Sequence, residues 1–209
     1  MTPLDVVDWR RSVFGLYDAV RREDDPATAH RLWRDGRDAL FAHHPATALL
    51  PEDRAGFTGL PVADYDPAWR FTLELEPAEP TGFAFETGTD GTVVFERAGI
   101  VRVPELPTGP GGPLDVWRLT SYGGGLFLPI ADGSRGTSGG TYGGGRYLLD
   151  TIKGADLGSD PAAGTLVVDF NFAYNPSCAY DPAWACPLAP AGDTLTTPIP
   201  VGELYFGTS

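Results

Sequence analysis

The chain has 209 residues, 42% of them hydrophobic, which is enough for one domain with a substantial core. Its formal net charge is −13, with 28 acidic residues against 15 basic ones. Nucleic acids and anionic membranes repel such a chain, because binding them normally requires a basic surface. We therefore expect no nucleic-acid partner and no membrane partner.

The sequence shows neither a secretory signal nor a membrane-spanning segment, and both observations bear on the cellular location of the protein. The first residues, MTPLDVVDWRR, do not show the basic segment followed by an apolar run that marks a secretory signal. No stretch approaches the roughly 18 apolar residues that a spanning helix needs. The expected location is the cytoplasm.

The first third of the chain has helical periodicity. Apolar residues recur every three to four positions in a first segment: Val6, Trp9, Val13, Leu16, Tyr17 and Val20. Pro26 favours the start of a second helix, because proline is tolerated in a first helical turn. That helix carries its own apolar stripe: Leu32, Trp33, Gly36, Leu40 and Phe41. Pro45 and Pro51 then predict a loop, so we expect a helical pair within residues 1–55.

From about Trp69 the periodicity changes to two, which is typical of half-buried antiparallel strands. The expected strands are 71–75, 83–85, 93–95, 100–103, 115–119, 126–130, 146–150, 166–172 and 201–206. Short turns connect them, and Asp90-Gly91 is a good hairpin turn. The predicted fold class is α+β and mainly β. It is one domain over 1–209, with the helical pair on an antiparallel β-barrel or sandwich formed by 65–209.

The segment DFNFAYNPSCAYDPAWACP, residues 169–187, is the most informative one. On a strand, Asp169 and Asn171 would share one face, opposite Phe170 and Phe172. An acid and an amide are costly to bury unless they find partners. The segment is therefore either a functional site or a polar pin that holds an irregular loop.

Arg146 is expected on a strand inside the β body. A buried arginine needs a carboxylate, and Asp169 and Glu203 are the natural partners. Such a cluster is either a structural ion pair or a functional one, which would be a clamp for an anionic substrate or an acid/base pair. Tyr142 and Tyr180 have polar groups on aromatic rings, which suits pocket walls as well as cores.

The two cysteines, Cys178 and Cys186, are spaced C-x₇-C. Zinc sites usually show C-x₂₋₄-C, so we expect no metal. Two packed thiols, a disulfide and a catalytic Cys178 stay open as alternatives, and we favour reduced thiols. A catalytic Cys178 would need a base such as His43 or His44. His44 itself either caps the second helix or faces a pocket, and His30 is expected at the surface.

Glycines cluster at 123–125 and 136–145. Neither cluster has the lysine of a phosphate loop or the spacing of a dinucleotide fingerprint, so no cofactor is expected. The glycines indicate tight turns, or else a glycine-lined pocket. The sequence also lacks a G-x-S-x-G nucleophile elbow.

Several blocks together resemble a known family. The run GGTYGGGRYLLD, followed by VVDFNFAYNPSCAYDPAWACPLAP and a late VGEL, is similar to domain of unknown function 1684, a bacterial and archaeal family. The earlier blocks FAHHP, AGFTGLPV and DYDPAWRF fit as well, so the resemblance runs from about Leu32 to Glu203. It singles out motif positions and implies no reaction.

We expect a small-molecule enzyme with a polar pocket. The candidate catalytic residues are Arg146, Asp169, Glu203 and Cys178. The candidate ligand-binding residues are Tyr142, Asn171, Asn175, Tyr180 and His44. A ligand-binding barrel without chemistry and a structural or interaction protein remain as alternatives.

Overall fold

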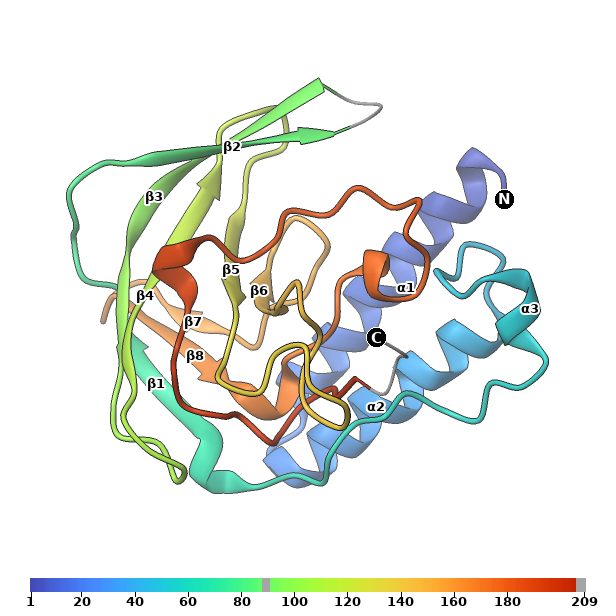
Figure 1. Cartoon of the computed structure of the whole chain (residues 1–209), viewed down its shortest axis with the longest axis horizontal. Coiled ribbons are helices and arrows are strands. Elements are labelled where there is room, and N and C mark those ends of the chain that lie inside the picture. The colour runs from blue at the N-terminus through green and yellow to red at the C-terminus, as the bar shows by residue number, and fades with distance from the viewer. Residues whose placement is uncertain (88–90, 206–209) are drawn as a thin grey trace.

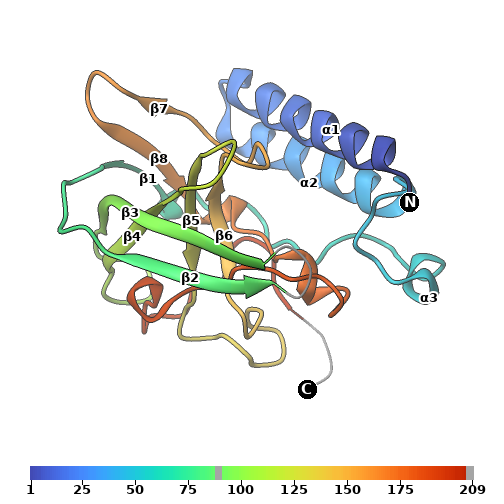
Figure 2. The same cartoon turned by 90° about the horizontal axis from the view of Figure 1, so that it is seen from above.

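The computed structural model describes residues 1–87 and 91–205. Two long helices, α1 (Pro3–Arg22) and α2 (Pro26–His43), precede the β structure, and the short α3 (Pro51–Arg54) follows them. Figure 2 shows α1 and α2 side by side along one side of the β structure, with α3 beyond the end of the pair. The helical pair is confirmed. Pro51 starts a helix where we expected a loop.

Local capping explains where the two long helices begin. Thr2 and Asp5 form a capping box at the start of α1. Asp25 accepts a hydrogen bond from the Thr28 N–H at the start of α2, and Pro26 occupies its first turn. The helices then pack through an aromatic contact in which Trp33 Nε1 donates to the Tyr17 hydroxyl at 3.0 Å.

The strands form two antiparallel sheets (Figure 1). The five-stranded sheet is a meander of β2 (Gly82–Thr87), β3 (Gly91–Val103), β4 (Gly112–Leu119), β5 (Leu126–Ile130) and β6 (Arg146–Asp150). The three-stranded sheet has the order β1 (Arg70–Glu74), β8 (Thr165–Asp169) and β7 (Ser159–Asp160). The fold is therefore α+β and mainly β. Within the described residues β2 and β6 are opposite edges of the larger sheet, so this sheet is not a closed barrel, and the predicted barrel or sandwich is not confirmed.

Two hydrophobic clusters hold these layers together. The larger one lies between the sheets and includes Leu114 and Leu128 from one sheet and Val168 from the other. The second cluster joins the helical pair to the β structure, with Trp33 of α2 packing against Phe172 at 5.2 Å between ring centroids. Because Phe172 follows β8 directly, α2 is fixed next to the segment 169–187.

Some predicted strands differ from the observed ones. The expected strands 93–95 and 100–103 are one strand, β3, interrupted by a bulge between Arg97 and Gly99. Residues 201–205 form no strand, only a single bridge from Glu203 to Val62. Asp90, half of the predicted hairpin turn, lies outside the described residues. β2 and β3 nevertheless pair antiparallel.

The expected strand 166–172 ends early, at Asp169. Residues Phe170–Phe172 form a 3₁₀ turn instead. The Asp169 carboxylate accepts the Asn171 N–H at 3.0 Å and so caps this turn. None of the described helices is long and apolar enough to cross a membrane.

Candidate functional site

A buried glutamate, Glu203, lies where α2 meets the C-terminal segment. The backbone N–H of Glu203 donates to Ala173 O at 2.8 Å, which fixes the segment beside the end of the 3₁₀ turn. Gly202 makes this approach feasible. It has φ +76°, and a Cβ there would lie 2.6 Å from Phe170 O. A glycine directly before Glu203 therefore determines where the carboxylate lies.

Arg37 of α2 supplies the positive charge that Glu203 needs. Its Nη2 donates to Glu203 Oε2 at 2.6 Å. The guanidinium also lies about 5 Å from the ring centroids of Trp33 and Tyr174, a cation–π arrangement. The Asn175 N–H donates to the same Oε2 atom at 3.0 Å. Burial still dominates, and it raises the pKa of Glu203 above its ordinary value.

Glu203 lines a cavity of about 450 Å³, which we call the Glu203 cavity. Its walls come from the α3 region, the segment 175–180 and the C-terminal segment: Leu49, Asp53, Phe57, Gly59, Leu60, Pro61, Asn175, Ala179, Tyr180, Glu203, Leu204 and Tyr205. Most of this wall is apolar or aromatic. Polar groups therefore stand out in it, as expected for a small-molecule site.

Three buried polar atoms of this wall have no hydrogen-bond partner among the described residues: Glu203 Oε1, Asn175 Oδ1 and the Tyr180 hydroxyl. Asn175 Nδ2 donates to Leu204 O at 3.1 Å, so the orientation of this amide is fixed and its oxygen is the unpaired atom. The Tyr180 ring is held edge-on against Phe41 at 4.8 Å. Buried polar atoms are nearly always paired in folded proteins. Because three such residues line one cavity, this cavity is the candidate functional site.

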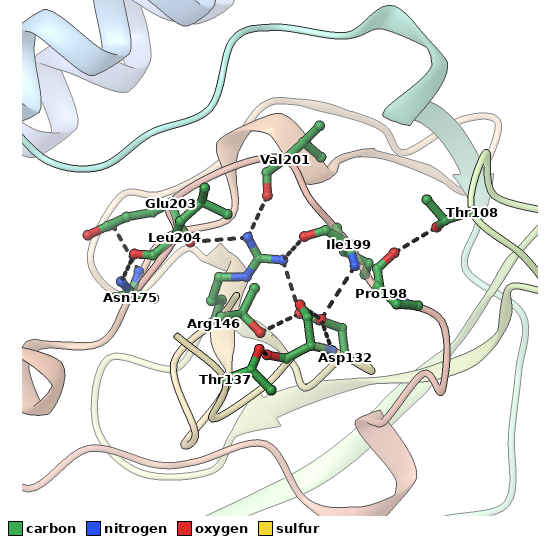
Figure 3. A network of polar contacts seen from close by, with 12 residues as sticks. Thr108, Asp132, Thr137, Arg146, Asn175, Pro198, Ile199, Val201, Glu203 and Leu204 are labelled. Atoms are coloured by element: carbon green, nitrogen blue, oxygen red, sulfur yellow. Dashed lines mark hydrogen bonds and ion pairs between the residues drawn. The ribbon is translucent and has the colours of Figure 1, made fainter. Parts of the chain in front are cut away.

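Arg146 is completely buried at the start of β6, but it does not line this cavity. Its Nη2 donates to Asp132 Oδ2 and to Ile199 O, each at 3.1 Å, while Nη1 donates to the carbonyls of Val201 and Glu203 (Figure 3). The prediction that the carboxylate of Asp169 or Glu203 pairs with Arg146 is wrong. Asp132 is the partner, and the guanidinium fixes the irregular C-terminal segment from inside.

Asp169 and Asn171 form a separate polar cluster. Arg70 Nη1 donates to Asp169 Oδ2 at 3.0 Å, and Asn171 Nδ2 donates to Asp169 Oδ1 at 2.7 Å. Asn171 also exchanges two hydrogen bonds with the backbone of Asp66. Burial raises the pKa of Asp169. With these partners, the two side chains act as the polar pin that was one of the two sequence alternatives.

Cys178 and Cys186 are free and half-buried, with Tyr142 beside them. The Tyr142 hydroxyl donates to Cys178 O at 3.3 Å and lies 3.8 Å from Cys178 Sγ. Burial raises the pKa of Tyr142. In the described residues no group of three or more histidine, cysteine, aspartate or glutamate side chains could hold a metal ion.

The histidines lie away from the Glu203 cavity. His44 is the C-cap residue of α2. Its Nδ1 accepts the Ala46 N–H at 3.0 Å and its Nε2 lies 3.3 Å from Asp8 Oδ2. His30 is 2% exposed, and its Nε2 lies 3.0 Å from Asn171 O. The expectation of a surface His30 is wrong, because α2 packs this residue against the 3₁₀ turn. Burial lowers the pKa of His30.

Of the predicted site residues, Asn175, Tyr180 and Glu203 meet at this cavity. Sequence reasoning missed Arg37, although a signal was present. Arg37 is four residues from both Trp33 and Phe41, so it shares their buried face of α2. It missed Asp132 too, and no local pattern marks that residue.

A family model described as "Protein of unknown function (DUF1684)" matches residues 55–204. The chain belongs to the DUF1684 family. The resemblance predicted from the sequence is thus confirmed over residues 55–204, whereas its expected earlier part, residues 32–54 with FAHHP, lies outside the match. The matched residues contain Asn175, Tyr180 and Glu203. Arg37 lies outside the residues that the DUF1684 model matches.

A solved structure is also similar to this chain. The chain is similar to the solution NMR structure of an uncharacterized protein from gene locus rrnAC0354 of Haloarcula marismortui, with 31% sequence identity and a TM-score of 0.60. The similarity covers 84% of this chain and 92% of that one. No curated protein matches the chain.

Proposed function

We propose that the protein is a small-molecule enzyme that binds its substrate in the Glu203 cavity. One observation carries this proposal: Glu203 Oε1, Asn175 Oδ1 and the Tyr180 hydroxyl are buried beside one cavity and lack partners among the described residues. Leaving such groups unpaired costs about 1–3 kcal/mol each. A bound substrate that pairs with them would remove that cost.

The chemistry of these atoms defines the substrate class. Glu203 Oε1 and Asn175 Oδ1 accept hydrogen bonds, so the substrate must donate them. Asp53 adds a carboxylate to the same wall. We therefore infer a substrate with an amine or hydroxyl group at one end and an apolar part that contacts residues such as Phe57 and Leu60. This differs from the anionic substrate that the sequence suggested.

Glu203 is the proposed general base. Its pKa is raised by burial, and a base works best when its pKa is near the working pH. Oε2 is held by Arg37 and the Asn175 N–H, which leaves Oε1 to take a proton from the substrate. Tyr180 and Asn175 would hold the reacting group in place.

Tyr180→Phe tests binding without disturbing the fold, since the hydroxyl has no partner among the described residues. Amine-bearing and polyol metabolites would first be screened for a rise in melting temperature. A true ligand should bind Y180F about five- to tenfold more weakly, the value of one hydrogen bond. Tyr65→Phe is the matched control, because the Tyr65 hydroxyl is also unpaired but does not line the cavity.

Turnover of that ligand, followed by mass spectrometry, separates an enzyme from a binding protein. Glu203→Gln should abolish turnover while leaving a folded chain that still binds. A ligand that binds and never changes would identify a non-catalytic ligand-binding protein. Equal weakening in Y180F and Y65F would remove the Glu203 cavity from consideration.

A further inference from the structure

The wall of the Glu203 cavity differs in exposure from one end to the other. Among the described residues that line this cavity, Glu203 is fully buried and Asn175 is 4% exposed, whereas Asp53 is the one exposed residue. Asp53 belongs to the short helix α3, which lies at the periphery of the molecule (Figure 2). The cavity therefore runs from a mouth at Asp53 to a floor at Glu203.

The floor of the cavity has no net charge when Glu203 is ionised. Arg37 Nη2 donates to Glu203 Oε2 at 2.6 Å, so the guanidinium balances the carboxylate. A ligand ammonium at the unpaired Oε1 would bring a second positive charge next to this guanidinium, and it would also lose its water. The hydrogen-bond donor that fits the floor is therefore an uncharged hydroxyl group.

The mouth, in contrast, carries one uncompensated negative charge. The Asp53 carboxylate has no ion pair and no hydrogen bond with another described residue. Arg54 follows it on α3, but Arg54 Nε donates to Leu49 O at 3.3 Å and Arg54 does not line the cavity. No lysine, arginine or histidine is among the described residues of the wall. The charge at this end therefore favours a cationic group.

Aromatic rings extend this preference along the wall. Phe57, Tyr180 and Tyr205 line the cavity. Phe57 and Tyr180 both pack on Phe41, at 6.3 and 4.8 Å between ring centroids, so α2 holds both rings in place. Aromatic rings attract cations and also bury alkyl chains. A cavity of about 450 Å³ has room for both ends of a small molecule.

We propose that the substrate is an amino alcohol, with its ammonium group at Asp53 and its hydroxyl group at Glu203, and that Asp53 selects the cation. This inference rests on the proposed function, because it assigns the two ends of a molecule bound in the same cavity. The alkyl part between the two ends lies against Phe57 and Leu60. Asp53 determines specificity and takes no part in the proposed proton transfer.

Three matched series of probes test this assignment: linear amino alcohols of about three to eight carbons, diols of the same lengths, and the corresponding hydroxy acids. Calorimetry measures their affinities for the whole chain. The best amino alcohol should bind about fivefold more tightly than its diol, which is the value of one exposed charge pair. The hydroxy acid should bind more weakly than the diol. Added salt should reduce the preference for the amino alcohol, because it screens an exposed charge.

Variants of α3 test whether Asp53 causes the preference. Asp53→Asn should make the affinities for the amino alcohol and the diol equal. Asp53→Lys should reverse the order, so that the hydroxy acid binds best. Glu52→Gln is the matched control, because Glu52 is exposed on the same helix but does not line the cavity, and this variant should keep the wild-type order. Both positions are exposed, so melting temperatures should stay close to that of the wild type.

Tyr180→Phe separates a failure of this inference from a failure of the proposed function. It should weaken the amino alcohol and the diol by the same factor, because it removes a contact that both ligands share. If Y180F weakens both ligands while D53N leaves their ratio unchanged, Asp53 does not select the substrate, although the cavity still binds it. A wild-type preference for the diol or the hydroxy acid would also overturn the amino alcohol. If no probe binds, or if Y180F changes nothing, both proposals are overturned.

Discussion

Arg37 and Glu203 are 166 residues apart in the chain, yet Arg37 Nη2 lies 2.6 Å from Glu203 Oε2. The Arg37 side chain is 11% exposed and that of Glu203 is fully buried. This ion pair connects the helical pair to the wall of the Glu203 cavity. The same contact therefore contributes to the stability of the fold and holds the Glu203 carboxylate in position at the cavity.

Arg37→Met should lower the free energy of unfolding by about 3–5 kcal/mol, because it leaves a buried carboxylate without its counter-charge. Methionine keeps an unbranched apolar side chain at this position and removes the guanidinium that lies over Trp33. Urea denaturation measures the loss. The double variant R37M/E203Q should recover much of it, since neither position then carries a buried charge. A single variant within about 1 kcal/mol of the wild type would show that the pair contributes little.

Arg146→Lys should cost about 3 kcal/mol or more, since one ammonium cannot replace the forked donors that reach Asp132 and three backbone carbonyls. Arg118→Lys is the matched control. Arg118 pairs with Glu96 at the surface, and an exposed pair is worth about 1 kcal/mol or less. Equal losses in the two variants would mean that the buried network is not a structural one.

Gly202→Ala should destabilise the fold more than Gly164→Ala. Both glycines have positive φ, +76° and +69°, so alanine is strained by about 1–2 kcal/mol at either position. At Gly202 the added Cβ would also lie 2.6 Å from Phe170 O and 2.8 Å from Ala173 O, whereas nothing lies within 4 Å at Gly164. Denaturant midpoints of the two variants give the difference. Equal midpoints would show that a small shift of the backbone near Gly202 removes the close contacts of the added Cβ.

Asp193 makes stability depend on pH. It is fully buried and accepts hydrogen bonds from Trp117 Nε1 and the Asp115 N–H, each at 2.7 Å. Burial raises the pKa of Asp193 from its ordinary 3.8 to about 7. The folded state thus holds this proton more tightly than the unfolded state. Its contribution to stability is largest below about pH 4 and falls as the pH rises to about 7.

Asp193→Asn should therefore flatten the decline of unfolding free energy between pH 4 and pH 7, by an amount on the order of a few kcal/mol. Asp64→Asn removes the same charge from a fully exposed position and should leave the slope unchanged. Denaturation at several pH values compares the three proteins. A D193N slope equal to the wild-type slope would contradict the prediction.

Local pattern was enough to predict most of the elements. The periodicities of 3.6 and two placed both long helices and the strands of the two sheets other than the short β7, because each of these elements buries one face. The end of β8 could not be predicted in this way. Asp169 stops the strand by capping the next turn, and its other partner, Arg70, comes from a distant part of the chain.

Part of the candidate site could also be predicted from local sequence pattern. Asn175, Tyr180 and Glu203 stood out as polar residues in apolar surroundings. Their neighbour Arg37 did not, because a charged residue on a helix is ordinarily solvated. The burial of Arg146 could be inferred from its strand, whereas its partner Asp132 lies in a loop without any regular pattern.

Arg37 enters the site from a helix that precedes residue 55, where the family match begins. A fragment trimmed to the matched region would retain the acid and lose its counter-ion, together with the aromatic ring of Trp33 that packs on Phe172. Anyone designing a shorter version for crystallisation or screening should therefore keep both N-terminal helices, even though the family's sequence signature does not include them.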